Sequence, residues 1–599
     1  MNEPIKVAAL DTETFYDNKN CTVKKLGAHG YTRHKDFDVL CVSGHTTDLQ
    51  DAGPWAQPRD SVPWTEIHGL PIVAHNVAFD RAVLRSMPEF PDIPNDQWYD
   101  SAALCAYHQY PRHLKGAAKE ILGIEKSKEV RSAMQGKRMA DLDKDETREF
   151  WEYAKSDAFL CHEIFQKLYP ITPSHEIKLA QLAVDQGERG ISIDRPLLDK
   201  SIESLKATHS EVIKGLPWVE KGFKIGSPIG LREACVKAGI KPPGSTSVGS
   251  PALEVWLSRN RSQATWIKAL HDHRSINRIL KTLEMIDTRL TPEDILQFGI
   301  KYCGSAATGR FSGDQGVNLL NLNKNAVHGV KLRHLFKPRP GHKFIICDLA
   351  QIEPRCLAWL TKDQAMLDAM NAGQDIYEAH ARSTMGYKDP RPLKEFDNEL
   401  RQMAKVRVLS MGYGLGSARH AENMGIDEDQ AKTEIDDFRE SAFKTSDYWS
   451  TLQTLFVKAS RGDRNLEYEL PSGREQRYFD IKKDFWTVDL GEGKREERHG
   501  LRCSTTKGDN RRFAFWGSKL CENVCQGVAR DVFCHGLLKV IEKGINVPFT
   551  VYDELVAEVP EKDAPQALKE IEEAMTAVPP WMPGLPLAVD AHIASWYDK

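Results

Sequence analysis

The stretch that decides the fold is KFIICDLAQIEPR, residues 343–355. Its apolar first half predicts a buried strand that ends at an acid, Asp348. Far downstream, residues 548–559 (PFTVYDELVAEV) place Asp553 and Glu554 in or beside a second apolar strand. Alone, each acid is more typical of a turn or a cap. Because a buried carboxylate is costly unless it is neutralised, acids on two such strands predict a site for two divalent cations and phosphoryl transfer.

Two cations lie between these strands, on a predicted helix that contains RQMAK (residues 401–405). Arg401 and Lys405 are four positions apart and therefore share one face of the helix. Two cations on one face repel unless an anion lies opposite, and a triphosphate is the obvious candidate. For this pair alone, a solvated basic face is the commoner explanation.

A second group of acids lies near the N-terminus. Asp11 and Glu13 end a predicted strand, where alternation puts both side chains on the same side. Asp80 follows a second predicted strand, and Tyr153 shares one face of a predicted helix with Asp157. These acids would repel in one cleft without hard divalent cations, which activate water for phosphodiester cleavage. A lone Asp-x-Glu is usually a surface feature. For the three motifs together, the alternative to an active nuclease site is an inactive relic of one.

Length and composition indicate a soluble, multidomain chain. The 599 residues are too many for one core, and 41% hydrophobic with 28% charged residues is typical of globular proteins. No apolar run approaches the about 20 residues of a membrane helix, and the N-terminus does not resemble a signal peptide. The 12 cysteines occur singly, without a Cys-x-x-Cys pair, which indicates reduced thiols and a cytoplasmic location.

Net charge does not point to nucleic acid, because the chain carries −4 at pH 7. A nucleic-acid enzyme of this charge must confine its positive potential to a cleft. One window of thirteen residues without an acid fits that requirement, and it contains Lys331, Arg333, Lys337, Arg339 and Lys343.

The order of motifs resembles the family A (polymerase I-like) DNA polymerases over about residues 175–599. The segments that carry the resemblance are TGRFS (308–312), residues 348–355, residues 401–414, QG (526–527) and YDE (552–554). The resemblance implies a right-hand architecture. The expected divisions are a thumb at 171–295, a palm at 296–360 and 501–599, and fingers at 361–500.

The same resemblance implies the roles of individual residues. Asp348, Asp553 and the Leu349 carbonyl would hold two Mg²⁺ ions, with Mn²⁺ as a substitute and Glu554 as an outer acid. Arg401 and Lys405 would grip the dNTP phosphates, and Lys405 would protonate the pyrophosphate. The nucleotide site would also include Gln351, Glu353, Leu409 and Tyr413, and the contacts to primer–template DNA would come from Arg310, Asn318, Asn321 and Gln526. Glu353 would block a 2′-hydroxyl, which favours DNA over RNA synthesis.

The N-terminal motifs resemble the DEDD exonuclease superfamily, in the subtype that has tyrosine in the third motif. The resemblance implies an RNase H-like 3′–5′ exonuclease domain over residues 1–170, which would trim a single-stranded DNA 3′ end. Asp11, Glu13, Asp80 and Asp157 would hold two Mg²⁺ ions, and Tyr153 would orient the attacking water. The predicted fold class is therefore α/β and α+β multidomain.

Several positions depart from the polymerase pattern. Leu409 stands where the family usually has Phe or Tyr, Tyr552 replaces a histidine but can still donate a hydrogen bond, and Glu522 replaces a common asparagine. The spacing from Arg310 to Asn318 is one residue longer than usual. Residues 482–512 are charged and Gly-interrupted, and are interpreted as a solvated insertion, with DNA or a processivity partner as alternatives.

The sequence thus predicts a monomeric proofreading DNA polymerase without a membrane partner. No 5′-nuclease region precedes the exonuclease motifs, which suits a phage enzyme in its host cytoplasm; any replication partner proteins stay unidentified. The alternatives are a 3′–5′ exonuclease whose C-terminal region only binds DNA, and a non-catalytic scaffold.

Overall fold

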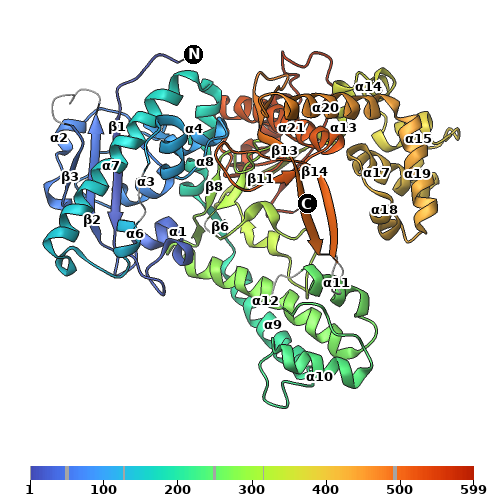
Figure 1. Ribbon diagram of the computed structural model, residues 1–599, viewed down its shortest axis with the longest axis horizontal. Helices are drawn as coiled ribbons and strands as arrows, with labels where there is room; N and C mark the ends of the chain where they lie inside the picture. The colour runs from blue at the N-terminus through green and yellow to red at the C-terminus, as the bar shows by residue number, and fades with distance from the viewer. Residues whose placement is uncertain are drawn as a thin grey trace.

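The computed structural model describes residues 2–46, 53–125, 129–246, 251–314, 316–489 and 495–598. A blue N-terminal unit lies beside a central unit, from which a green helical arm and a yellow-orange helical lobe project (Figure 1). Within the described residues no helix is both long and apolar enough to cross a membrane. All 12 cysteines are buried, and they form no disulfide with one another.

The N-terminal unit is built on a mixed sheet. Its strands, in the spatial order β3-β2-β1-β4-β5, are β3 (Trp55–Gln57), β2 (Val39–Thr46), β1 (Ala8–Thr14), β4 (Ile72–Ala74) and β5 (Trp98–Asp100). β1 runs antiparallel to β2 and parallel to β4. The strand that was predicted to end at Asp11 and Glu13 spans Ala8–Thr14, so both acids lie within it. Helix α7 (Lys144–Leu168), which begins with a capping box, packs across β1 and β2.

The helical arm consists of two long helices and a small tip. α9 (Arg195–Lys214) packs along α12 (Thr265–Arg289), while α10 (Pro228–Ala238) and α11 (Pro251–Asn260) form the tip. Three buried tryptophans fill the core of the tip: Trp218, Trp256 and Trp266.

The central unit contains an antiparallel sheet in the order β16-β17-β11-β18. The strands are β16 (Phe549–Val551), β17 (Glu554–Pro560), β11 (His342–Leu349) and β18 (Val589–Ala594). Alternate residues of β11 enter different cores. Ile345 and Cys347 face a core shared with α21 (Gly517–Glu542) and α22 (Ala564–Met575), and Phe344 and Ile346 face the core at the base of the arm. The predicted strand at 548–559 is a hairpin, because the chain turns at Tyr552 and Asp553.

The helical lobe lies beyond the central sheet and is followed by a second sheet. Its helices are α13 (Ile352–Leu360), α14 (Gln364–Asn371), α15 (Ile376–Thr384), α16 (Leu393–Phe396), α17 (Asn398–Leu409), α18 (Ser417–Met424), α19 (Glu428–Ser441) and α20 (Phe443–Arg461). The sheet contains β12 (Leu466–Glu469), β13 (Glu475–Asp489), β14 (Arg495–Ser504) and β15 (Phe513–Ala514).

Most of the charged stretch 482–512 belongs to strands β13 and β14. They form a long hairpin that reaches from the central unit toward the helical arm (Figure 1). Its outer part is exposed, with Phe485 80% exposed, which agrees with a solvated insertion, and it is a regular antiparallel hairpin. Residues 490–494, between the strands, lie outside the described residues.

A buried ion network joins the N-terminal half of the chain to the central unit. Glu176 on α8 (Ser174–Arg189) accepts hydrogen bonds from Arg530 on α21 at 2.5 and 2.7 Å and from the Tyr302 hydroxyl at 2.5 Å. Burial alone would raise the pKa of Glu176, but Arg530, Tyr302 and Arg474 lower it to about 2. The carboxylate is therefore held ionised inside the protein.

The first prediction concerns this network. Glu176→Gln removes one of the two buried counter-charges of Arg530 and leaves only Asp531 at 3.2 Å. We therefore expect a loss of about 3 kcal/mol in the free energy of unfolding and a melting temperature lower by about 3 °C at pH 7. The folded pKa lies below the ordinary value of 4.5, so the stabilisation is full above pH 4.5 and is lost as pH falls toward 2. Thermal scans across that range check it. The exposed Glu573→Gln is the control, and equal melting temperatures for both variants would contradict the prediction.

Candidate functional site

The two predicted metal-binding aspartates come together at one end of the central sheet. Asp348, near the end of β11, pairs in register with Glu554 at the start of β17. The Leu349 amide donates a hydrogen bond to the Asp553 carbonyl at 3.0 Å, which ties the two acidic segments to each other. Both aspartates are half-buried, whereas Leu349 is buried. Carboxylate and carbonyl oxygens in this arrangement suit Mg²⁺ or Mn²⁺.

Glu554 occupies a different environment from the aspartates. It is 2% exposed and accepts a hydrogen bond from the Tyr597 hydroxyl at 2.6 Å. Burial and the Glu554 carboxylate raise the pKa of Tyr597, so the tyrosine stays a donor. A buried, hydrogen-bonded carboxylate of this kind suits an acid that lies behind the two aspartates.

A pocket of about 280 Å³ opens next to Asp553. Its lining includes Arg310, Gln351, Glu353, Leu409 and Tyr552. Arg310 forms an ion pair with Glu353, and its guanidinium lies 5.8 Å from the centre of the Tyr552 ring. Gln351 and Tyr552 have φ angles of 54° and 55°, in the left-handed region that non-glycine residues rarely adopt outside functional sites.

Helix α17 carries the predicted phosphate-binding cations, and its last residue lines this pocket. Arg401 pairs with Asp375 at 3.2 Å and lies 5.2 Å from the centre of the Tyr377 ring. Lys405 follows one turn later and is exposed. Leu409 ends the helix, is 38% exposed and lines the pocket.

The turn after α17 positions Tyr413. Its hydroxyl is buried without a hydrogen-bond partner among the described residues. Burial, with Cys525 and Glu353 nearby, raises the pKa of Tyr413 well above its usual value. The next residue must be glycine, because Gly414 has φ 81° and a Cβ there would lie 2.0 Å from Ser518 Oγ.

The predicted DNA-contact residues have hydrogen bonds within the chain. The Asn318 side chain accepts from the Leu320 amide at 3.1 Å, and Asn321 accepts from the Tyr552 hydroxyl at 2.8 Å. Tyr552 thus donates a hydrogen bond, as expected for the residue in place of histidine. Gln526 on α21 donates to Glu522 at 3.3 Å.

Arg474 is a residue that the sequence did not single out. It is 6% exposed, and its Nε donates to Asp531 Oδ1 at 2.9 Å. Its Nη2 donates to the Thr308 and Gly527 carbonyls at 3.0 and 3.1 Å. Arg474 therefore links the segments that carry Arg310 and Gln526. The only sequence signal is Asp531, an acid within the mostly apolar run of α21.

The N-terminal acids form a separate cluster on β1, α3 (Val77–Arg85) and α7. Ligand oxygens of Asp11, Glu13 and Asp157 all lie within 4.8 Å of one another. Asp80 is buried and accepts hydrogen bonds from the Thr12 amide at 3.0 Å and hydroxyl at 2.7 Å. Burial and the Asp11 charge raise the pKa of Asp80 well above its usual value. A bound divalent cation would relieve this repulsion, so the all-oxygen donor set fits Mg²⁺ or Mn²⁺.

Tyr153 and Arg131 complete this cluster. Burial and the carboxylates of Glu13 and Asp11 raise the pKa of Tyr153, which keeps its hydroxyl protonated. Arg131, on α6 (Glu129–Ala133), was not predicted. Burial would lower its pKa, but Glu13, Tyr153 and Asp11 raise it, so this guanidinium is the local counter-charge to the acids. No motif in the sequence marks it.

Known proteins resemble the chain along most of its length. The model of DNA polymerase family A matches residues 197–599. The DNA polymerase of Bacillus phage SP02 is 24% identical over 99% of this chain and 100% of its own length. DNA polymerase I of Rhizobium leguminosarum is 25% identical over 69% of this chain, which spans only 38% of that relative.

One solved structure shares the fold. The POL domain of Pol1 from M. smegmatis, in complex with DNA primer-template and dNTP, matches with a TM-score of 0.68 and 17% identity. The match covers 99% of this chain and 96% of that one. Together with the mixed helices and strands, it confirms the predicted α/β and α+β multidomain polymerase fold.

The second prediction concerns Arg474. Arg474→Lys keeps the positive charge but loses the guanidinium hydrogen bonds to Asp531, Thr308 and Gly527. We expect this loss to destabilise the folded segment by about 2 kcal/mol. We expect hydrogen–deuterium exchange in residues 304–312 to increase more than about tenfold through local opening. The control is Arg498→Lys on the exposed hairpin. Unchanged exchange in 304–312 would show that Arg474 does not hold this segment.

Proposed function

This chain belongs to DNA polymerase family A, and from that premise we propose that it extends DNA primers by two-metal catalysis and removes 3′ ends at a separate site. The observation that carries the synthetic site is the 3.0 Å hydrogen bond from the Leu349 amide to the Asp553 carbonyl. It ties the segment that carries Asp348 to Asp553, which lines the pocket of about 280 Å³. In the proposed division, residues 171–295 are the thumb, 361–500 the fingers, and 296–360 with 501–599 the palm.

In synthesis, Asp348, Asp553 and the Leu349 carbonyl would hold Mg²⁺. The ions would activate the primer 3′-hydroxyl and stabilise the triphosphate. Arg401 and Lys405 bind the triphosphate from α17, and Lys405 gives a proton to the departing pyrophosphate. The ion pair with Asp375 at 3.2 Å orients the guanidinium group of Arg401 before the nucleotide binds.

Glu353 and Tyr413 select the sugar of the incoming nucleotide. Glu353 lines the pocket beside Leu409, and its charge lowers the stability of the ionised form of Tyr413. A ribose 2′-hydroxyl would meet the Glu353 side chain, so deoxynucleotides are preferred. Arg310, Asn318, Asn321 and Gln526 contact the primer–template duplex, and minor-groove acceptors common to correct pairs let them test pair shape.

In excision, Asp11, Glu13, Asp80 and Asp157 would hold the Mg²⁺ ions that activate water and stabilise the leaving oxygen. Tyr153 orients the attacking water through a hydroxyl that stays protonated. Arg131 lies among the same acids and stabilises charge on the scissile phosphate. The substrate is a single-stranded DNA 3′ end, and the N-terminal sheet is the proposed RNase H-like domain.

The proposed setting is a monomeric replicative enzyme of a phage, acting in the host cytoplasm. Its likeness along the full length of the SP02 phage polymerase supports this setting. An exonuclease whose C-terminal region merely binds DNA is disfavoured, because Asp348 and Asp553 lie on neighbouring segments of one sheet. Arg401 and Lys405 lie on α17, whose last residue, Leu409, lines the pocket next to Asp553. A scaffold without catalysis is disfavoured for the same reason.

The third prediction separates the two activities. Asp348→Asn should slow primer extension at least about a hundredfold, because several kcal/mol of metal stabilisation is lost, and leave single-strand digestion intact. Asp11→Asn should do the reverse. Extension and digestion gels with magnesium measure both. If either variant lost both activities while keeping its wild-type melting temperature, the two sites would not be independent.

The fourth prediction concerns Leu409, which lines the pocket where the family usually has Phe or Tyr. The wild type should use dideoxynucleotides poorly. Leu409→Tyr should improve dideoxynucleotide use relative to dNTP more than about tenfold, or ~1.4 kcal/mol, since a tyrosine hydroxyl can stand in for the missing 3′-hydroxyl. Competitive single-nucleotide incorporation measures the ratio. Leu409→Met is the control, and efficient termination by the wild type would contradict the prediction.

A further inference from the structure

A large cleft opens onto the N-terminal acid cluster and is walled by both halves of the chain. Its volume is about 1090 Å³, and Asp11 and Asp157 are among its lining residues. One wall comes from residues 109–120 of the N-terminal unit. The other comes from the polymerase half, from residues 301–306 and from residues 506–511 after the β13–β14 hairpin.

The polymerase wall is fixed to the N-terminal unit through Gln109. Its side-chain amide donates to the Thr505 and Arg477 carbonyls at 2.8 and 2.9 Å, and its side-chain carbonyl accepts from the Arg477 amide at 2.7 Å. The Gln109 backbone carbonyl accepts from the Lys507 amide at 2.9 Å. Gln109 therefore forms hydrogen bonds to both chain segments at the base of the β13–β14 hairpin. These bonds fix the position of residues 506–511 relative to the N-terminal unit that carries the acids.

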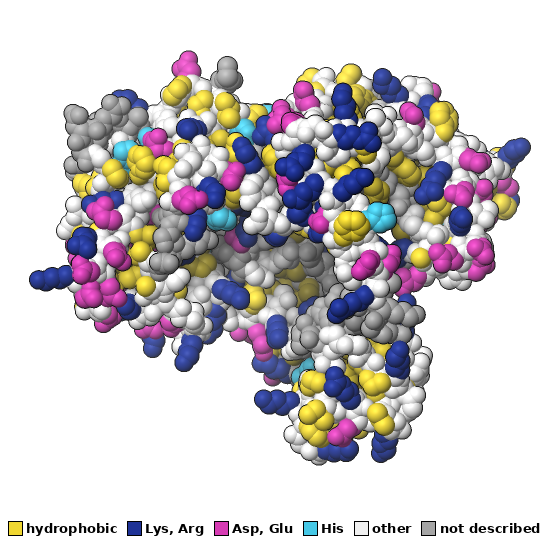
Figure 2. All heavy atoms as spheres, viewed as in Figure 1, with side chains coloured by type: hydrophobic (Ala, Val, Ile, Leu, Met, Phe, Trp, Pro, Cys, Tyr) yellow, Lys and Arg dark blue, Asp and Glu magenta, His cyan; other side chains and the backbone are white. Residues whose placement is uncertain are grey.

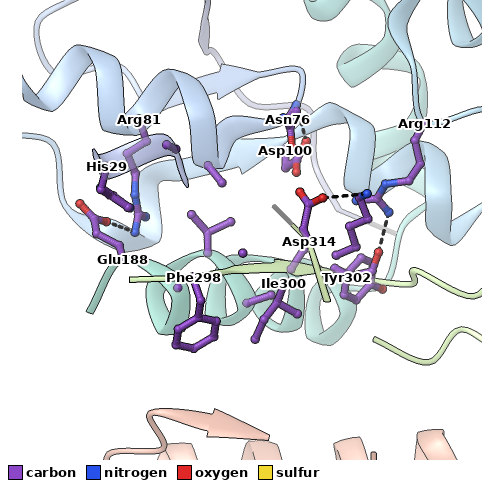
Figure 3. A pocket seen from close by; sticks show the side chains of 18 residues that line it. His29, Asn76, Arg81, Asp100, Arg112, Glu188, Phe298, Ile300, Tyr302 and Asp314 are labelled. Carbon is purple, nitrogen blue, oxygen red and sulfur yellow. Dashed lines mark hydrogen bonds and ion pairs between the residues drawn. The ribbon is translucent and has the colours of Figure 1, made fainter. Parts of the chain in front are cut away.

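A second contact fixes residues 301–306 to the same unit. Arg112 donates to the Tyr302 carbonyl at 2.6 Å. Figure 3 shows Arg112 reaching across to Tyr302, with Asp314 next to it on the polymerase side. Lys301 pairs with Asp314 at 2.8 Å, so its ammonium group is held at this junction.

The side chains along the cleft favour a polyanion. Six Lys and Arg residues line it: Arg112, Lys115, Lys119, Arg131, Lys301 and Arg511. Among the described residues, the acids that line it besides Asp11 and Asp157 are three: Glu120, Asp314 and Asp509. Figure 2 shows Lys and Arg side chains gathered on the central unit where it faces the N-terminal unit.

The cleft also offers an aromatic ring. Tyr110 lines it, and the Lys507 ammonium lies 5.3 Å from the centre of the Tyr110 ring. Single-stranded nucleic acid binds where cations follow the backbone and aromatic side chains stack on unpaired bases. A duplex hides its base faces, so this combination suits an unpaired strand.

We propose that this cleft binds the unpaired 3′-terminal segment of the primer, and that Lys301 and Arg511 of the polymerase half contact its phosphates. The inference rests on the proposed excision function and adds the path by which the strand reaches it. The N-terminal domain supplies the reacting groups, whereas strand binding needs both halves of the chain. Arg511 is well placed for this, since its side chain is 79% exposed and pairs only at the surface with Asp509 at 2.7 Å.

The test compares two substrates of the full-length double variant Lys301→Gln/Arg511→Gln. A ten-residue oligothymidylate fills the cleft, whereas the p-nitrophenyl ester of thymidine 5′-monophosphate reaches only the acids. For the oligonucleotide we expect KM to rise about tenfold with kcat unchanged. The slope of log KM against log salt should fall by about 1.4, or 0.7 for each lost phosphate contact. Hydrolysis of the ester should be unchanged.

The matched control is Lys483→Gln/Arg498→Gln, which removes the same charges from the hairpin outside the cleft and should leave KM and the salt slope as in the wild type. Unchanged KM and slope in the Lys301→Gln/Arg511→Gln variant, with normal ester hydrolysis, would overturn the proposed strand path and leave the excision function standing. Equal effects in both double variants would also overturn it, because bulk charge would then explain them. Failure of the wild type to hydrolyse either substrate would overturn the excision function itself.

Discussion

The pairing of β11 with β17 is the constraint on which the synthetic site depends. Alternate residues of β11 are buried in two different cores, so the strand cannot slip by one residue without exchanging both sets. That register places Asp348 opposite Glu554 and next to Asp553. Carboxylates so close are unfavourable by themselves, and the packing of the apolar residues around them supplies the free energy that keeps them together until cations bind.

The buried ion network extends this rigidity from the central sheet to the rest of the enzyme. Glu176 on α8 binds Arg530 on α21, and Arg474 joins α21 to the segment before Arg310. Buried ion pairs contribute little net stability compared with apolar packing, but their directional hydrogen bonds tolerate few alternative arrangements. The network is therefore better explained by geometry than by stability: it holds the proposed duplex contacts and the excision cleft on one framework.

The sequence predicted what depends on neighbouring residues and missed what depends on distant ones. The strands that carry Asp11 and Asp348, and the helices that carry Asp157 and Lys405, follow from local periodicity. The turn at Tyr552 was missed because β-branched and apolar residues flank it without a glycine. The β13–β14 strands were missed because charged residues and glycines interrupt the apolar residues of this stretch. Arg131, Gln109 and Glu176 left no signal, and Arg474 left only that of its partner Asp531, since their partners lie far away in the chain. The site assignments themselves stay predictions.

Three of the cations that are proposed to contact the substrates are each paired with an acid. Arg310 pairs with Glu353, Arg401 with Asp375, and Lys301 with Asp314, so each cation has an acidic neighbour of its own. Such pairs keep clustered cations from repelling one another and hold each side chain in one orientation. An incoming phosphate must compete with this carboxylate for the cation. The competition lowers the affinity of the cation for phosphate and shortens the time for which the strand stays bound. In the proposed enzyme, which would release and rebind its strand at two sites, weaker cation–phosphate contacts of this kind would favour exchange over tight binding.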